Sequence, residues 1–157
     1  MAASVAETAR NAAFLTLKVS PRLSRWIQTQ MNADDDHDIS IRQLTALQFI
    51  SDSETTLGDV ARSLNVTPAV VTGLIDRLER RGYVRRIGSM FDRRRVHIEL
   101  TTAGEDVRDH AEDRLASELE QRVARLSQDE ITTMFKGLKV LDKVLTSIDQ
   151  ERLPRSS

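Results

Sequence analysis

The sequence is poor in the residues that stabilise disulfide-rich domains and β-sandwiches. Among its 157 residues it has no cysteine, three prolines, six glycines and 4% aromatic residues. Without cysteine, the chain cannot form disulfide bonds, thiolate nucleophiles, Cys-ligated zinc sites or thiol redox sensors. The small numbers of glycine and proline disfavour an all-β sandwich, which needs many turns, and predict a helix-rich fold. At this length we expect one domain, with or without helical extensions.

Long apolar runs and clustered metal ligands are also missing. No stretch of about 18 apolar residues occurs, and the N-terminus lacks the basic-then-apolar pattern of a signal peptide, so we expect a cytoplasmic protein without membrane contact. The three histidines, His37, His97 and His110, are far apart in the sequence and predict no metal site. The carboxylates and hydroxyls form no recognisable set of nucleophile and base, so we expect neither an enzyme nor a cofactor.

Charge is balanced over the whole chain but unevenly distributed. The sequence has 23 Lys and Arg against 24 Asp and Glu, a formal net charge of −1. Residues 76–95 contain eight arginines and three carboxylates, whereas residues 102–130 contain nine carboxylates and four arginines. A local basic stripe on a neutral or acidic body is typical of nucleic-acid contact. A solvated charged surface would explain the run equally well, so the surrounding motif has to decide.

Apolar residues at helical spacing predict helices before the basic stripe. The first covers residues 5–31, and Pro21 either kinks it or starts a new helix there. An acidic linker follows, and a second helix opens at Ser40, where Gln43 completes a capping box. A third, short helix is capped by Thr56.

A fourth helix has clear signals at both ends. Thr67 is expected to cap it and Pro68 to occupy its first position. Gly82 ends it in the left-handed conformation that glycine tolerates. The residues expected to face the core are Val71, Leu74, Ile75 and Leu78.

Beyond the fourth helix the apolar pattern changes from helical to alternating. This predicts strands over residues 83–87 and 95–100, joined by a hairpin tip at residues 88–94. Helix, turn, helix and a basic-tipped hairpin form a winged helix-turn-helix, with the hairpin as the wing.

Two helices are predicted after the wing. Thr102 with Glu105 forms a capping box that starts a long helix, and Ser127 with Glu130 starts the last one. In the last helix, apolar residues at alternating spacings of three and four form a seam that packs against a partner helix: Ile131, Met134, Leu138, Leu141, Leu145 and Ile148. The predicted fold class is mainly α with a small β-hairpin wing (α+β).

The fourth helix is the candidate DNA-reading element, because the second helix of a helix-turn-helix enters the major groove. Its threonine hydroxyls can bind a phosphate or a base, and its small apolar side chains can meet a thymine methyl group. The predicted contacts are Thr67, Pro68, Ala69, Val70, Thr72, Gly73, Asp76 and Arg77. Thr67 is a cap in either case, and core packing is the alternative for Val70.

The wing tip carries the second candidate DNA contact. Asp92, Arg93, Arg94 and Arg95 place guanidinium groups on a narrow projection that suits the minor groove. Asp92 is expected to orient a neighbouring arginine through a bidentate pair. The alternative is a surface ion-pair cluster of little energetic consequence.

These motifs resemble the MarR family of bacterial transcription regulators. The similar stretches are residues 66–84, the wing Asp92-Arg93-Arg94, and residues 100–104, within a resemblance that covers residues 12–150. The resemblance implies a homodimer whose first and last helices interlock, which binds a palindromic operator in double-stranded DNA and is released by a small ligand. It also implies that Arg94 enters the minor groove and that Asp92 positions it.

The resemblance further implies a division into three regions. Residues 1–36 would form an N-terminal dimerisation region, residues 37–101 the winged helix-turn-helix DNA-binding domain, and residues 102–157 the C-terminal dimerisation helices.

The sequence departs from the family pattern at two places. The family often has a longer polar side chain where this chain has Gly73, so recognition of DNA shape gains weight here. In the wing, Ser89-Met90-Phe91 replaces an Asp-x-Arg pattern, which removes one basic contact for which Arg95 is expected to compensate.

Ligands of this family usually bind between the dimerisation helices and the winged domain. The candidate ligand-binding residues are Trp26, Met31, Phe49 and His110, each with core packing as the alternative. Lack of cysteine excludes the thiol-based peroxide sensors of the family, and the scattered histidines disfavour its zinc sensors. The remaining alternatives are a small aromatic or lipophilic effector and a regulator that has no effector.

The sequence thus predicts a sequence-specific DNA-binding transcriptional regulator, a repressor that acts as a homodimer and responds to a ligand. An activator would bind DNA in the same way. The alternative is a winged-helix module that binds an acidic protein partner and no DNA.

Overall fold

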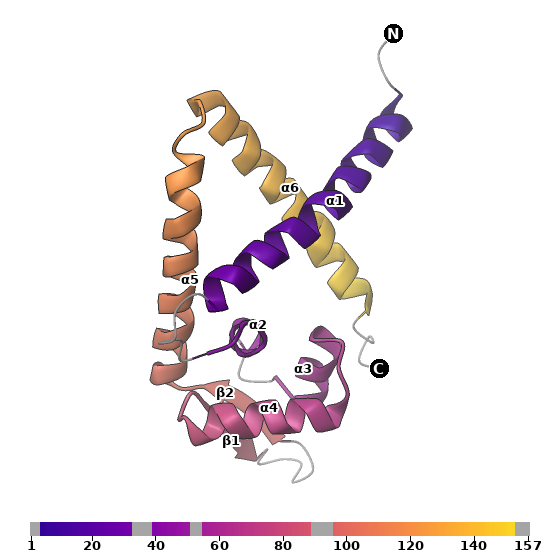
Figure 1. The fold of residues 1–157 in the computed structure, drawn as a ribbon. Helices are drawn as coiled ribbons and strands as arrows, with labels where there is room; N and C mark the ends of the chain where they lie inside the picture. Colours follow the sequence, from indigo (N-terminus) through magenta and orange to yellow (C-terminus); the bar gives the residue numbers. More distant parts are fainter. Residues whose placement is uncertain (1–3, 33–38, 51–54, 89–95, 153–157) are drawn as a thin grey trace. The chain divides into compact units, whose positions relative to one another are not determined.

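A computed structural model of the chain describes residues 4–32, 39–50, 55–88 and 96–152 (Figure 1). These ranges contain α1 (Val5–Asn32), α2 (Ile41–Phe49), α3 (Leu57–Ser63), α4 (Pro68–Arg80), β1 (Val84–Gly88), β2 (Val96–Leu100), α5 (Thr102–Val123) and α6 (Gln128–Arg152). The two strands pair antiparallel, which confirms the predicted mainly helical fold with one hairpin. Among the helices described, none combines the length and apolar character that a membrane crossing requires.

The chain divides into two compact units. The first, Met1–Leu115, holds α1 to β2 and the first part of α5, and the second, Ala116–Ser157, holds the rest of α5 together with α6. The functional division into three regions, made from the sequence, stays a prediction.

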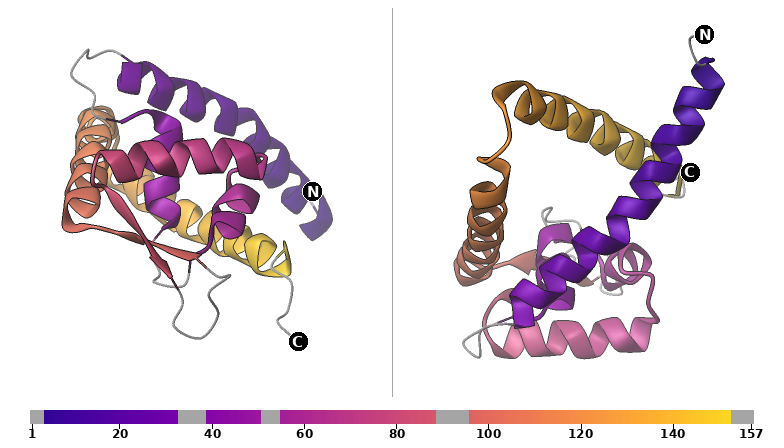
Figure 2. Two further views of the ribbon diagram at one scale, coloured as in Figure 1. Left: turned by 90° about the horizontal axis from the view of Figure 1, so that it is seen from below. Right: turned by 45° about the horizontal axis from the view of Figure 1, so that its top comes forward.

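The core of the first unit forms around α4. Val71, Leu74, Ile75 and Leu78 are at most 2% exposed, as their helical spacing predicts. The helix packs against α3 and β1, and the view from below in Figure 2 shows the hairpin leading away from the end of α4. The other large buried side chains come from α2 and its C-cap residue, from α3 and from the hairpin: Leu44, Leu47, Ile50, Val60, Val84 and Ile98. One side of α4 is therefore fixed in the core and the other faces outward.

Reciprocal side-chain caps start α2 and α3. At α2, the Ser40 amide donates to Gln43 Oε1 (2.8 Å) and the Gln43 amide donates to Ser40 Oγ (3.3 Å). At α3, Thr56 and Asp59 exchange the same pair of bonds, at 2.9 and 3.3 Å. Both caps satisfy amide groups that a helix start leaves without partners, and both confirm the predicted boundaries.

Three helix starts or interruptions differ in detail from the sequence predictions. α1 is one helix that contains Pro21, so the alternative of two separate helices is wrong. Thr67 occupies the N-cap position of α4, but its side chain makes no capping bond. The Val70 amide donates to the Thr67 carbonyl oxygen (3.1 Å).

The start of α5 is capped by Thr101 rather than by the predicted Thr102. The Thr101 hydroxyl accepts from the Gly104 amide (3.1 Å) and donates to the Gly82 carbonyl oxygen. Its amide donates to the Tyr83 carbonyl oxygen (3.1 Å). Thr101 rather than Thr102 caps the helix because Thr101 lies at the end of the hairpin, next to the turn that follows α4, and bonds that turn.

Backbone conformation explains the glycines at this junction. Gly82 has φ = 76°, in the left-handed region that the sequence analysis predicts for the end of α4. Gly104 allows a close approach, because a Cβ atom at this position would lie 1.9 Å from the Tyr83 carbonyl oxygen. The glycine at 104 is therefore a packing requirement of the α5–hairpin junction.

Two glycine-to-alanine substitutions should have opposite effects on stability. Gly104→Ala forces the Cβ atom into backbone and should lower the free energy of unfolding by about 2–3 kcal/mol. Gly73→Ala, in α4, adds a Cβ that meets nothing within 4 Å and should raise it by about 0.5–1 kcal/mol through helix propensity. Urea unfolding at one fixed protein concentration measures both. Equal effects of the two substitutions would contradict this reading of the junction.

Candidate nucleic-acid interface

The predicted DNA-reading residues of α4 lie on its outward side. Thr67, Pro68, Ala69, Val70, Thr72, Asp76 and Arg77 are exposed, and Gly73 is half-buried. Val70 is 41% exposed, so the alternative that it belongs to the core is wrong. The structure thus brings these eight residues together on one surface, opposite the buried stripe.

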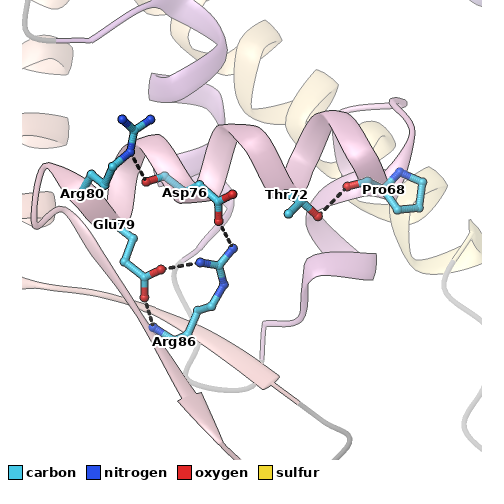
Figure 3. Close-up of polar contacts among 6 residues, drawn as sticks. All are labelled: Pro68, Thr72, Asp76, Glu79, Arg80 and Arg86. Carbon is cyan, nitrogen blue, oxygen red and sulfur yellow. Dashed lines mark hydrogen bonds and ion pairs between the residues drawn. The ribbon is translucent and has the colours of Figure 1, made fainter.

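The first two turns of this surface are small and largely apolar. The Thr72 hydroxyl donates to the Pro68 carbonyl oxygen (2.9 Å; Figure 3), so its proton is used within the helix. A base can still meet the Thr72 methyl group or donate to the Thr72 oxygen. Residues 67–75 include no Arg, Lys, Asn or Gln, the side chains that form bidentate bonds with purines. Apolar contact is the main readout this surface offers.

Basic groups gather at the other end of α4. Arg77 and Arg80 are exposed, and the Arg80 Nε atom donates to the Asp76 carbonyl oxygen (3.3 Å). The Arg81 guanidinium lies over the Tyr83 ring, 5.4 Å from its centroid. These positive groups continue the outward surface of the helix and suit contact with phosphates.

Arg86 of β1 connects the strand with α4 through two carboxylates (Figure 3). Its Nη2 atom lies 2.6 Å from Asp76 Oδ1, and its Nη1 atom donates to Glu79 Oε2. The Arg86 amide also donates to Glu79 Oε1 (3.2 Å). We call these three residues the Arg86 bridge.

The bridge is partly shielded from water. The Arg86 side chain is 26% exposed, whereas those of Glu79 and Asp76 are 37% and 50% exposed. Partial burial acts to lower the pKa of Arg86, but the hydrogen bonds and charges of Asp76 and Glu79 outweigh it and raise this pKa above its ordinary value. Asp76 and Glu79 therefore stabilise the charged form of Arg86.

This bridge is absent from the sequence predictions, in which Arg86 belongs to the basic stripe and Asp76 to the DNA contacts. The signal that could have found it is strand alternation, which places Arg86 on the same side of β1 as the buried Val84. Asp76 and Glu79 are three residues apart, and this spacing places them on one face of α4.

Arg85, the neighbour of Arg86, is paired within the hairpin. It stands opposite Glu99 in the antiparallel register, and its Nη2 atom lies 3.0 Å from Glu99 Oε2. The basic stripe of residues 76–95 therefore contains both arginines with carboxylate partners and arginines that face outward.

The wing-tip prediction concerns Asp92, Arg93, Arg94 and Arg95, which lie outside the described residues. Their role in DNA binding stays a prediction. β1 and β2, which carry this segment, are both described.

The four candidate ligand residues have different surroundings. Met31 is 4% exposed and belongs to the core, and the Arg114 Nη2 atom donates to its sulfur (3.6 Å). Phe49 is half-buried and packs against the same core, Trp26 is half-buried on α1, and His110 is exposed on α5. The ligand-binding role of all four stays a prediction. Within the described part of the chain, no group of three or more His, Asp or Glu side chains could hold a metal ion.

The order of elements now defines the class of protein. α3 and α4 form a helix-turn-helix, and the β1–β2 hairpin follows it as a wing, so the first unit contains a winged helix-turn-helix. The sequence model of the MarR family matches residues 37–95, which cover α2, α3, α4 and β1 and end just before β2.

Individual relatives agree with this match. The chain is 29% identical over 115 residues to YfiV of Bacillus subtilis (strain 168), an uncharacterized HTH-type transcriptional regulator, with 73% of this chain and 72% of YfiV covered. It is 35% identical over 86 residues to the HTH-type transcriptional repressor YetL of the same organism, with 50% and 52% covered.

A solved structure extends the similarity to most of the chain. The crystal structure of Streptococcus pneumoniae FabT in complex with DNA is 29% identical, with a TM-score of 0.61 and coverage of 90% of this chain and 99% of FabT. Residues 37–95 thus match the MarR family model, and most of the chain is similar to the transcriptional regulator YfiV and to FabT. The curated relatives are regulators rather than enzymes.

Proposed function

We propose that this protein binds double-stranded DNA and that the outward surface of α4 enters the major groove. The observation that carries the proposal is the division of α4 into a fully buried stripe and an opposite surface of small, hydroxyl and basic side chains. The solved structure of FabT in complex with DNA supports it, because FabT shares this fold and 29% of the residues. A regulator of bacterial promoters acts in the cytoplasm, where we place the protein.

The active form is a homodimer. In the single chain, α1 and α6 each leave large apolar side chains between 38% and 69% exposed: Phe14, Leu17, Leu23, Met134, Leu138, Leu145 and Ile148. Water contact of so many apolar groups costs free energy that a second copy removes by covering them. Those of α6 belong to the seam expected from the sequence.

The dimer presents two copies of α4 to successive major grooves about 34 Å apart and therefore binds a palindromic operator. The two wings reach the flanking minor grooves through Arg94. We assign the protein as a repressor, as its relative YetL is an HTH-type transcriptional repressor.

Release from DNA is controlled by a small aromatic or lipophilic effector, and no cofactor is needed. The effector changes the distance between the two copies of α4. It can do so only by binding one arrangement of the dimer more tightly than the other, since the coupling equals that difference in affinity.

DNA binding is tested by fluorescence anisotropy with duplexes from upstream of the protein's own gene. Tight binding to one duplex should weaken at least about a hundredfold between 50 and 200 mM salt, because phosphate contacts release counterions. Arg94→Ala should weaken the free energy of operator binding by about 1–3 kcal/mol.

Two results would contradict the proposal. One is weak binding that is the same for every duplex, and the other is binding that is insensitive to salt and to Arg94→Ala. Either result would favour the winged-helix module that binds an acidic protein partner.

Dimerisation is tested with two substitutions in α6 that add the same charge. Leu138→Glu places a carboxylate in the apolar seam and should raise the dissociation constant of the dimer at least tenfold, or about 1.4 kcal/mol. Thr133→Glu, at an exposed position outside the seam, should leave it unchanged. Sedimentation over a range of protein concentrations measures both constants. Equal constants for the two variants would exclude the seam as the dimer interface.

The apolar reading surface predicts recognition of thymine methyl groups. Replacing an operator thymine that meets Val70 with deoxyuridine removes only the methyl group and should lower affinity about fourfold, or ~0.8 kcal/mol. With Val70→Ala, the same replacement should have no further effect, because the protein side of the contact is gone. Deoxyuridine outside the bound segment is the control. Unchanged affinity at every operator thymine would refute this mode of readout.

A further inference from the structure

The Arg86 bridge joins two elements that the proposed function requires to act together. Asp76 and Glu79, one turn apart on α4, bind the same guanidinium group. Glu79 additionally accepts a hydrogen bond from the Arg86 backbone amide, so it binds both the backbone of β1 and the Arg86 side chain. A planar guanidinium held on two sides restricts direction as well as distance.

The charge of the bridge is unfavourable for a DNA-binding surface. Two carboxylates surround one guanidinium, which leaves a net charge of −1. The carboxylates are 50% and 37% exposed, and Asp76 belongs to the surface proposed to enter the groove. Phosphates are repelled by such a group, so a surface adapted for charge alone would not contain it.

Because its negative charge disfavours DNA binding, the Arg86 bridge is better explained by a geometric role. We propose that Asp76, Glu79 and Arg86 are positioning residues, which fix the angle between α4 and the β1–β2 hairpin so that both meet the DNA in one register. The inference rests on the proposed function. Apolar packing of Leu78 and Val84 holds the two elements together, but apolar contacts have no direction. The Arg86 bridge fixes the orientation of α4 relative to the hairpin.

This role predicts an effect opposite to that of charge alone. Glu79→Gln removes a negative charge near DNA, and a purely electrostatic account expects tighter binding to every duplex. The positioning role expects operator affinity to fall at least about tenfold, while affinity for a non-operator duplex stays the same or rises. Gln keeps the size of Glu and an oxygen that can accept from the Arg86 amide, so the variant retains the local structure.

Arg85 provides a matched control for Arg86. Both arginines are on β1 and both have carboxylate partners, but Arg85 pairs with Glu99 inside the hairpin. Arg85→Gln and Arg86→Gln remove the same charge, so the difference between them measures the bridge. Arg86→Lys keeps the charge without the planar two-sided contact and should not restore operator affinity.

Fluorescence anisotropy with operator and non-operator duplexes, at several salt concentrations, tests the inference. We expect Glu79→Gln and Arg86→Gln to lower the ratio of operator to non-operator affinity at least tenfold, and Arg85→Gln to leave this ratio within about twofold of the wild type. The salt dependence should be the same for all variants. Loss of folded protein would reduce the active fraction and leave the ratio unchanged, so the ratio separates positioning from stability.

Three results would overturn the inference. The first is operator binding by Glu79→Gln as tight as, or tighter than, that of the wild type. The second is an equal loss for Arg85→Gln and Arg86→Gln, each with a salt slope reduced by about one, which would identify both as phosphate contacts. The third is a wild-type protein that binds no duplex, which would refute the proposed function itself.

Discussion

Burial of one side of α4 is the constraint on which the remaining features depend. Val71, Leu74, Ile75 and Leu78 are removed from water by α3 and the hairpin, and this fixes the rotation of the helix about its own axis. Once that rotation is set, Val70 and Thr72 must face outward, whatever other role they have. The same packing brings β1 next to α4, so that an arginine on the strand can reach two carboxylates on the helix. The reading surface and the bridge are thus two results of a single apolar contact.

Local signals in the sequence predicted most of the fold. The caps at Ser40 and Thr56, the left-handed glycine at 82 and the alternation in the hairpin depend on neighbours within four residues or on strand geometry, and the structure confirms them. Choosing Thr101 over Thr102 needed a bond to a residue 19 positions away, and two adjacent threonines give no local reason to prefer one. The Arg86 bridge was missed for the same reason, because its partners lie seven and ten residues earlier, across a turn.

The predicted site is divided in the same way. Helical periodicity was sufficient to place the eight residues of α4 on one surface, since exposure follows directly from which residues are buried. It could not reveal that the Thr72 proton is used inside the helix, or that Asp76 is bound by an arginine. Those facts change the chemistry of the surface from hydrogen-bonding to mainly apolar, with a carboxylate that is already engaged. The assignment of Trp26 and His110 to a ligand site depends on how regions of the proposed dimer meet, which no periodicity within one chain encodes.

The junction at Thr101 has a mechanical consequence. Only this residue separates β2 from α5, and its amide and hydroxyl bind the carbonyl oxygens of Tyr83 and Gly82. The absence of a Cβ at Gly104 lets the first turn of α5 rest directly on the same backbone. The start of α5 and the residues at which α4 ends therefore form one stiff joint without a flexible linker. A tilt of the first turn of α5 would therefore turn the last part of α4 with it.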